Sequence, residues 1–94
     1  MAKINLKYIA HFSLLTGKLE EGIEVREKTT AGDLIKQLGE KYSGFQEVLV
    51  DEKAGRLNSR NKVAIRKAGR WTENITTLEG LNMELSDGDT LIFW

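Results

Sequence analysis

The final ten residues, Leu85-Ser-Asp-Gly-Asp-Thr-Leu-Ile-Phe-Trp94, carry the signal that decides the fold of this 94-residue chain. Asp87-Gly88 is a strong turn signal, because glycine and, less readily, aspartate accept positive backbone φ angles. The residues from Thr90 to Trp94 are apolar at nearly every position, which is typical of a central strand that is covered on both faces. The sequence therefore predicts a closing strand in the middle of a sheet.

Two shorter strands are predicted upstream of the closing strand. Lys62 to Arg66 is the first of them, and a turn at Ala68-Gly69 ends it. Trp71 to Thr77 contains a short further strand, and Leu78 to Leu81 is expected to form a tight helical turn or a loop. Both strands would belong to the same sheet as the closing strand.

An alternating pattern near the N-terminus predicts a hairpin. Between Lys3 and Phe12 every second residue points to one face, which is the period of a half-buried strand. The residues of this row are Ile4, Leu6, Tyr8, Ala10 and Phe12. Gly22 to Arg26 alternates again, and Gly17 lies in the connection. Two such runs joined by a short connection that contains glycine are typical of a β-hairpin.

A helix is predicted to follow the hairpin. Thr30 can accept a hydrogen bond from the backbone N–H three residues on, and Asp33 places a carboxylate in the positive first turn. The next apolar residues recur at helical spacing and form one stripe that a sheet would cover: Ala31, Leu34, Ile35, Leu38 and Tyr42. One further apolar turn is expected from Phe45 to Leu49. Asp51 to Asn61 is expected to be a polar, mobile loop.

These elements indicate a single domain over residues 1–94, of the α+β class. A hairpin, one crossing helix and a return to a central final strand form a roll, in which a mixed sheet of four to five strands packs on one main helix. A chain of this length makes about one domain. It buries roughly 60–65 % of the surface that its unfolded chain would expose, which is enough for one modest core.

The composition excludes several kinds of chemistry. The chain has no cysteine, which excludes disulfides, thiolate metal ligands and cysteine nucleophiles together. His11 is the only histidine, so neither a Ser/His pair nor a zinc cluster is indicated, and we expect this side chain to be solvated or to face a partner. Turn chemistry explains Asp87 and Asp89. We therefore expect no catalytic residue, no cofactor and no metal.

Targeting signals are also missing from the sequence. It has neither a signal-peptide pattern nor an apolar run near the ~18 residues that a membrane span needs, and no glycine-rich phosphate loop. We therefore expect a cytoplasmic protein.

Fourteen basic residues balance fourteen acidic ones, so no net field attracts the protein to nucleic acid or to anionic lipid. No Asp or Glu lies between Lys53 and Thr72, however, and the basic stretch within this interval comprises Arg56, Arg60, Lys62, Arg66, Lys67 and Arg70. A solvated hairpin and a docking patch for an acidic partner both fit this stretch. Single-stranded nucleic acid could also bind here by charge and by stacking on Trp71, although one aromatic residue in a neutral domain is weak support.

In the order of its elements, the chain resembles the ubiquitin-like β-grasp sulfur carriers (the MoaD/ThiS-like family), which include the small subunit of molybdopterin synthase and the thiamin sulfur carrier. Four segments carry the resemblance: Ala10 to Gly17, Glu24 to Ile35, Leu38 to Phe45 and, as the most specific, Asn74 to Phe93. The last one contains the Leu-x-Asp-Gly-Asp turn that leads into the final strand in this family. The resemblance covers almost the whole chain and implies a ubiquitin-like β-grasp fold.

The sequence departs from this family at its end. Family members continue past the last strand in a proline-containing tail that ends in Gly-Gly. An activating enzyme adenylates the terminal carboxylate, which sulfur then converts to a thiocarboxylate. The present sequence ends at Trp94 with neither feature, and as written it cannot carry this group. A genuine end at this residue and a tail missing from the sequence are both possible; the initial Met and the absence of a tag favour the first.

The resemblance implies a non-enzymatic domain that binds proteins and is related to the sulfur carriers of molybdopterin (molybdenum or tungsten) cofactor synthesis. In that family the partners are the large subunit of the synthase and an E1-like activating adenylyltransferase. We expect Phe93 and Trp94, at the root of the family tail, to bind a partner, with Trp71 and Arg70 as a second pair, because aromatic residues and arginine are enriched in interfaces. Trp94 could equally cap the core. The alternatives are a true sulfur carrier whose tail is missing from the sequence, and a single-stranded nucleic-acid binder.

Overall fold

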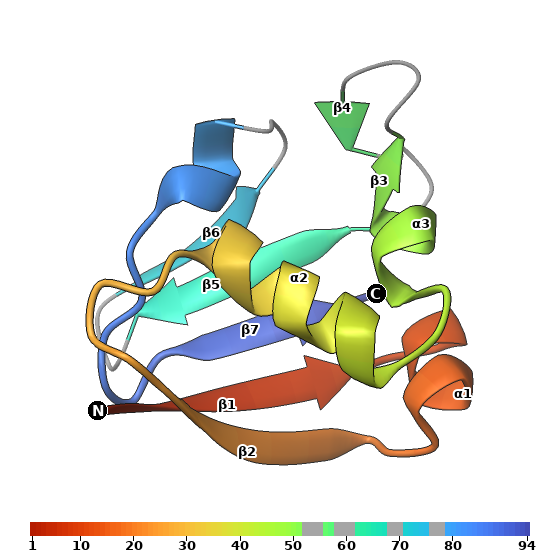
Figure 1. The fold of residues 1–94 in the computed structure, drawn as a ribbon, viewed down its shortest axis with the longest axis horizontal. Helices are drawn as coiled ribbons and strands as arrows, with labels where there is room; N and C mark the ends of the chain where they lie inside the picture. Colours follow the sequence, from red (N-terminus) through yellow and green to blue (C-terminus); the bar gives the residue numbers. More distant parts are fainter. Residues whose placement is uncertain (52–55, 58–61, 68–70, 76–78) are drawn as a thin grey trace.

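The computed structural model describes residues 1–51, 56–57, 62–67, 71–75 and 79–94 (Figure 1). In chain order the elements are β1 Ala2–Tyr8, α1 His11–Thr16, β2 Glu20–Val25, α2 Ala31–Lys41, α3 Phe45–Leu49, β3 Val50–Asp51, β4 Arg56–Leu57, β5 Val63–Lys67, β6 Trp71–Ile75, the 3₁₀ helix η1 Glu79–Asn82 and β7 Thr90–Phe93. Five of the strands form one sheet in the order β2-β1-β7-β5-β6, while β3 and β4 pair separately.

The closing strand β7 lies at the middle of this sheet, as the sequence predicts. It runs parallel to β1, where Leu6 lies opposite Leu91, and antiparallel to β5, where Ile65 lies opposite Leu91. The outer pairs, β1 with β2 and β5 with β6, are both antiparallel. The mixed five-stranded sheet and the crossing helix confirm the predicted α+β roll.

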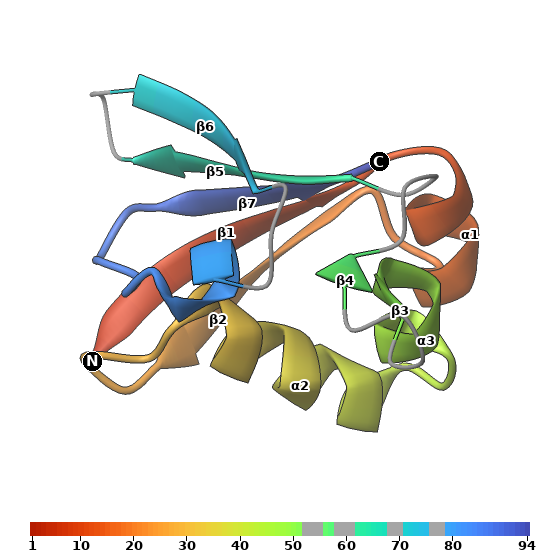
Figure 2. The same cartoon turned by 90° about the horizontal axis from the view of Figure 1, so that it is seen from above.

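Helix α2 begins where its capping residues place it. The Thr30 hydroxyl accepts a hydrogen bond from the Asp33 backbone N–H at 3.1 Å, and the Asp33 carboxylate accepts one from the Thr30 N–H at 3.2 Å. This reciprocal pair satisfies two backbone donors that the first turn of a helix leaves free. Figure 2 shows α2 and α3 on one side of the five-stranded sheet, and no described helix covers the other side.

Gly39, in the second half of α2, allows α3 to approach closely. A Cβ atom at this position would come within 3.0 Å of the Gln46 Cβ, which is shorter than an ordinary van der Waals contact. The lower helix propensity of glycine is therefore offset by a close packing contact, which a larger residue would force apart by a few tenths of an ångström.

Four aromatic rings hold the closing strand against the helical layer. The Phe93 ring lies 5.1 Å from the ring of Phe45, 5.6 Å from that of Phe12 and 5.9 Å from that of Tyr8, measured between centroids. All four side chains are buried. Aromatic pairs at these separations contribute beyond the area that they bury, so Phe93 ties the middle of the sheet to the centre of the core.

A carboxylate satisfies the polar ends of two tyrosines at the edge of this core. Glu21 accepts hydrogen bonds from the hydroxyls of Tyr8 at 2.8 Å and Tyr42 at 2.6 Å, and from the Lys41 ammonium at 2.9 Å. Partial burial opposes ionisation of this carboxylate, but the donors from Tyr42, Lys41 and Tyr8 outweigh it and lower the pKa of Glu21 to about 2. Burial and the same carboxylate raise the pKa of Tyr8.

The Asp87-Gly88-Asp89 turn is joined to the start of β1. The Lys3 backbone N–H donates to the Asp87 carboxylate at 2.7 Å, and the Lys3 backbone carbonyl accepts from the Gly88 N–H at 2.9 Å. Gly88 has a φ of 88°, which glycine adopts without steric cost. The Asp89 side chain is buried and accepts from the Ser86 backbone N–H at 2.7 Å. Both aspartates therefore have the structural roles that the turn pattern indicates.

The N-terminal strand is shorter than predicted. It ends at Tyr8, and the chain turns at Ala10, whose φ of 54° and ψ of −120° leave the extended region. Residues His11–Thr16 then form α1, which ends at Gly17 with a φ of 73°. The prediction of one strand to Phe12 is therefore wrong, although Phe12 is buried as its place in the apolar row suggested.

The prediction that β7 is covered on both faces is also wrong. Leu91 and Phe93 are fully buried, whereas Thr90 and Ile92, which point to the opposite face, are only half-buried. The apolar run reflects a covered face on one side and a partly exposed apolar strip on the other.

Several expectations fall on residues outside the described part of the chain. Most of the predicted loop over residues 51–61 and the turn at residues 68–69 are among them. The β3–β4 pair, which joins Val50 to Leu57 and Asp51 to Arg56, was not predicted. The predicted helical turn after residue 77 is present as η1. No helix in the described ranges is long and apolar enough to cross a membrane.

Candidate functional site

The side of the five-stranded sheet away from α2 and α3 is the candidate site, and we call it the open face. In β1 the even-numbered residues are buried, so the odd-numbered ones point to the open face. The strand register then assigns the remaining members. The open face comprises Glu20, Gly22 and Glu24 of β2; Lys3, Asn5 and Lys7 of β1; Thr90 and Ile92 of β7 with the adjoining Trp94; Ala64 and Arg66 of β5 with the adjoining Lys62; and Thr72 and Asn74 of β6.

An apolar strip crosses the middle of the open face. Ile92 lies directly opposite Ala64 on one side and Lys7 on the other. Ala64 is only 1 % exposed and yet is not part of the main core cluster, because its neighbours on the open face cover it. Trp94 continues the strip, since its backbone N–H donates to the Lys62 carbonyl at 2.9 Å and thus extends the β5–β7 register by one pair. Ile92 and Trp94 are half-buried.

The charges on the open face differ between its two sides. Lys3 and Lys7 lie directly opposite Glu24 and Glu20 in the β1–β2 ladder, where opposite charges attract across the strands. On β5, the exposed Arg66 lies between Thr90 and Thr72, which are uncharged. The acidic members of the face are thus confined to β2.

Lys67 lies on the other side of β5 and is held there. Its ammonium group forms an ion pair with the buried Asp89 carboxylate and also donates to the Glu84 carbonyl at 3.3 Å and the Ser86 hydroxyl at 3.4 Å. Because side chains alternate between the two faces along β5, neighbouring basic residues of this stretch point to opposite sides of the sheet. Arg66 faces outward and Lys67 is bound to the turn that precedes β7.

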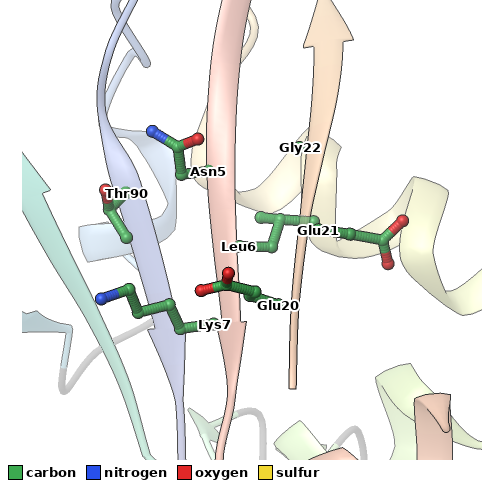
Figure 3. Close-up of a pocket in the computed structure, with 7 residues that line it drawn as sticks. All are labelled: Asn5, Leu6, Lys7, Glu20, Glu21, Gly22 and Thr90. Atoms are coloured by element: carbon green, nitrogen blue, oxygen red, sulfur yellow. The ribbon is translucent and has the colours of Figure 1, made fainter. Parts of the chain in front are cut away.

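A shallow hollow of about 470 Å³ lies beside the apolar strip, over β2, β1 and β7 (Figure 3). It exists because Gly22 has no side chain where its neighbours on β2 carry glutamates. Its lining includes Asn5, Lys7, Glu20 and Thr90. The hollow is shallow and carries polar groups of both signs, so it suits contact with a side chain of another protein.

The structure separates the two pairs of residues that the sequence singles out. Phe93 is fully buried, so it supports the neighbouring Trp94 and does not present its own side chain. Trp71 begins β6 opposite Lys67, at the other end of β5 from the Trp94 contact, and Arg70 lies outside the described residues. The binding role of all four stays a prediction.

Sequence reasoning did not single out Ile92 and Ala64. The signal that could have identified Ile92 is the parity of the closing strand, because Leu91 and Phe93 fill one face and leave Ile92 and Trp94 on the other. His11, the first residue of α1, is exposed as expected. Among the described residues, no group of three or more histidine, aspartate or glutamate side chains could hold a metal ion.

No family model matches the sequence, and no curated protein matches it significantly. Several solved structures do match. The putative molybdopterin converting factor subunit 1 from Pyrococcus furiosus is 30% identical, with a TM-score of 0.65 over 99% of this chain and 95% of its own. The small archaeal modifier protein 1 from Methanosarcina acetivorans is 26% identical, with a TM-score of 0.70 over 99% of this chain and 91% of its own. A Haloferax volcanii protein has a TM-score of 0.76 at 24% identity, over 98% of this chain and 80% of its own.

Proposed function

Because the chain belongs to the ubiquitin-like β-grasp family of molybdopterin converting factor subunit 1 and the small archaeal modifier proteins, we propose that it works by binding other proteins through its open face. The observation that carries the proposal is the half-buried strip of Ile92 and Trp94 on a side of the sheet that no described helix covers. The domain has no need of a cofactor in this role and acts without catalysing a reaction.

The apolar strip is partly exposed to water, which is unfavourable for apolar side chains. Apolar side chains at the centre of a sheet face gain about 25 cal/mol for each Å² that a partner removes from water. Aromatic residues are frequent anchors in such contacts, and charged residues at the rim give specificity. Trp94 and Ile92 provide the anchor here, with Lys7 and Arg66 beside them. The names of the matched proteins agree with this mode of action, because a "subunit" and a "modifier protein" both act together with another protein.

By resemblance, the proposed partners are a protein like the large subunit of molybdopterin synthase and an E1-like adenylyltransferase. Each would contact Trp94, which lies at the end of the central strand. The test is calorimetric titration of the chain with both kinds of protein from the same organism. Replacing Ile92 by glutamate should weaken binding by about thirtyfold or more, as expected for a hot-spot residue. Lys36→Glu, on the exposed side of α2, should have no effect.

Equal binding by wild type and the Ile92→Glu variant, with both proteins folded by circular dichroism, would refute docking through the open face. Trp71→Ala tests the second pair, because a loss with this variant alone would move the contact to β6.

A sulfur-carrier role is the second candidate, because the family resemblance extends to the turn and strand that lead into the carrier tail. That chemistry needs a terminal diglycine, which residues 1–94 do not include. The intact mass of the protein isolated from its natural source distinguishes the two roles. A mass that includes further residues ending in diglycine, with one oxygen replaced by sulfur, would establish the carrier.

A further inference from the structure

Two cations at β5, Lys62 just before the strand and Arg66 within it, have no acidic residue opposite them in the described strand register, unlike Lys3 and Lys7. Lys62 and Arg66 are both exposed, and in the described part of the chain neither takes part in an ion pair. They are four residues apart on an extended strand and so have Cα atoms about 13 Å apart. Ala64 lies between them, and Ile92 lies beside Ala64. Ala64 itself is only 1 % exposed, so the apolar surface beside the two positive groups is that of the half-buried Ile92.

The residues around Lys62 and Arg66 determine which charge a partner protein must carry where it covers them. A partner that buries Lys62 and Arg66 removes water from both, which is costly unless anions replace it. The side chains beside them in the register, those of Thr90, Thr72 and Trp94, are uncharged. On the opposite side of the face, Lys3 and Lys7 already lie opposite glutamates.

From this geometry we infer that the open face takes an acidic protein surface, with two carboxylates that reach Lys62 and Arg66 and an apolar side chain between them that packs on Ile92. This inference names the chemistry of the partner and rests on the docking role proposed above. It also fixes an orientation, because carboxylates placed over β2 would meet Glu20 and Glu24 and be repelled.

Nucleic acid fits the same surface less well. A phosphate backbone binds to a track of many cations, and bases need exposed aromatic rings on which to stack. Lys67 is held by Asp89, and the only described aromatic side chain on the open face is Trp94. The glutamates on β2 would repel a strand that crossed the sheet.

The test uses nuclear magnetic resonance titration of the isotopically labelled chain with three probes. The peptide Glu-Ser-Leu-Ser-Glu, when extended, spaces its carboxylates like the two cations, and Lys-Ser-Leu-Ser-Lys is its charge-reversed counterpart. An oligothymidylate is the nucleic-acid probe. We expect the acidic peptide alone to shift the amide signals of residues 62–66 and 90–94, weakly but saturably.

Reversing the charges of Lys62 and Arg66 tests the same contact from the side of the protein. The double variant Lys62→Glu/Arg66→Glu should lose roughly tenfold or more in affinity for the acidic peptide, the order expected for two exposed ion pairs turned into repulsions, and should gain affinity for the lysine peptide. The control variant Lys28→Glu/Lys36→Glu has the same change in net charge at exposed positions away from the open face and should bind like wild type.

Three results would overturn the inference: no shift on the open face with the acidic peptide, equal shifts with both peptides, or saturable binding of the oligothymidylate alone. None of them removes the docking role, because the titrations with whole partner proteins would still show it. Loss of partner binding in Ile92→Glu, together with unchanged partner binding in the β5 double variant, would mean that the strip docks and the two cations do not select the partner.

Discussion

The two faces of β5 and β7 differ in what their side chains contact. On the covered face, Phe93 and Leu91 are buried against the helical layer, and Lys67 is fixed by Asp89. On the open face, Ile92 is half-buried, and Arg66 has no charged partner among the residues that the structure describes. Residues adjacent in sequence therefore differ: side chains on the covered face are packed or paired within the domain, whereas those on the open face are partly or fully exposed. The covered face holds the fold together, and the apolar strip of the open face is left partly exposed.

The largest expected difference between the faces lies in the closing strand itself. Phe93→Ala should lower the free energy of unfolding by about 3–5 kcal/mol, because it removes a buried ring in contact with three others and leaves a cavity. Ile92→Ala should cost only about 1 kcal/mol, because its side chain is half-exposed. Urea denaturation of both variants measures this, and similar losses in the two would contradict the division between faces.

The next effect compares two neighbouring cations. Lys67→Met should destabilise the fold by roughly 2–4 kcal/mol, because the Asp89 carboxylate is only 1 % exposed and loses its ammonium partner. Arg66→Met, one residue away on the open face, should change stability by less than about 0.5 kcal/mol. Thermal denaturation of the pair decides the point. If the arginine variant proves the less stable one, the assignment of these side chains to faces is wrong.

A smaller effect depends on pH. The pKa of Glu21 is about 2 in the folded protein, against an ordinary value of 4.5. Its ionised form therefore stabilises the fold fully above pH 4.5, and this contribution is lost as the pH falls through the range from 4.5 to about 2. The loss should be on the order of 2 kcal/mol, allowing for the partial exposure of the group.

Denaturation of wild type and Glu21→Gln over this pH range measures the contribution of that carboxylate. The variant should be less stable near neutral pH and should change less on acidification. Parallel curves for the two proteins would show that other carboxylates cause the acid sensitivity.

The smallest expected effect is a gain in stability. Ala10 has a φ of 54° with a ψ of −120°, a conformation that is costly for a residue with a Cβ and easily reached by glycine. Ala10→Gly should therefore raise the free energy of unfolding by about 1 kcal/mol, although the greater freedom of glycine in the unfolded chain offsets part of the gain. A melting temperature that falls in Ala10→Gly would contradict the positive φ.

Most of the covered face could be predicted from the sequence, because local signals and burial agree there. Thr30 and Asp33 form the expected capping box, and the predicted stripe after them is buried except at Tyr42, which is half-buried. The turn before β7 also follows from its own residues. In each of these cases the chemistry that sets the local conformation lies within a few neighbouring positions.

The sequence was less informative where conformation depends on distant contacts. Nothing in the residue type of Ala10 indicates a positive φ, so the start of α1 could not be located from the alternation around it. The open face was missed for a different reason. The residue type of an apolar position in a strand does not show whether a helix covers that position. Only the arrangement of the helices on one side of the sheet distinguishes Ile92 from its buried neighbours.

The position of β7 also has a consequence for how the domain is made. Its neighbours β1 and β5 do not pair with each other, so within the five-stranded sheet the β1–β2 and β5–β6 hairpins are joined through β7. Contacts between the first and last strands close nearly the whole length of the chain, and such long loops slow folding. The five-stranded sheet is therefore complete only when β7 pairs with both hairpins.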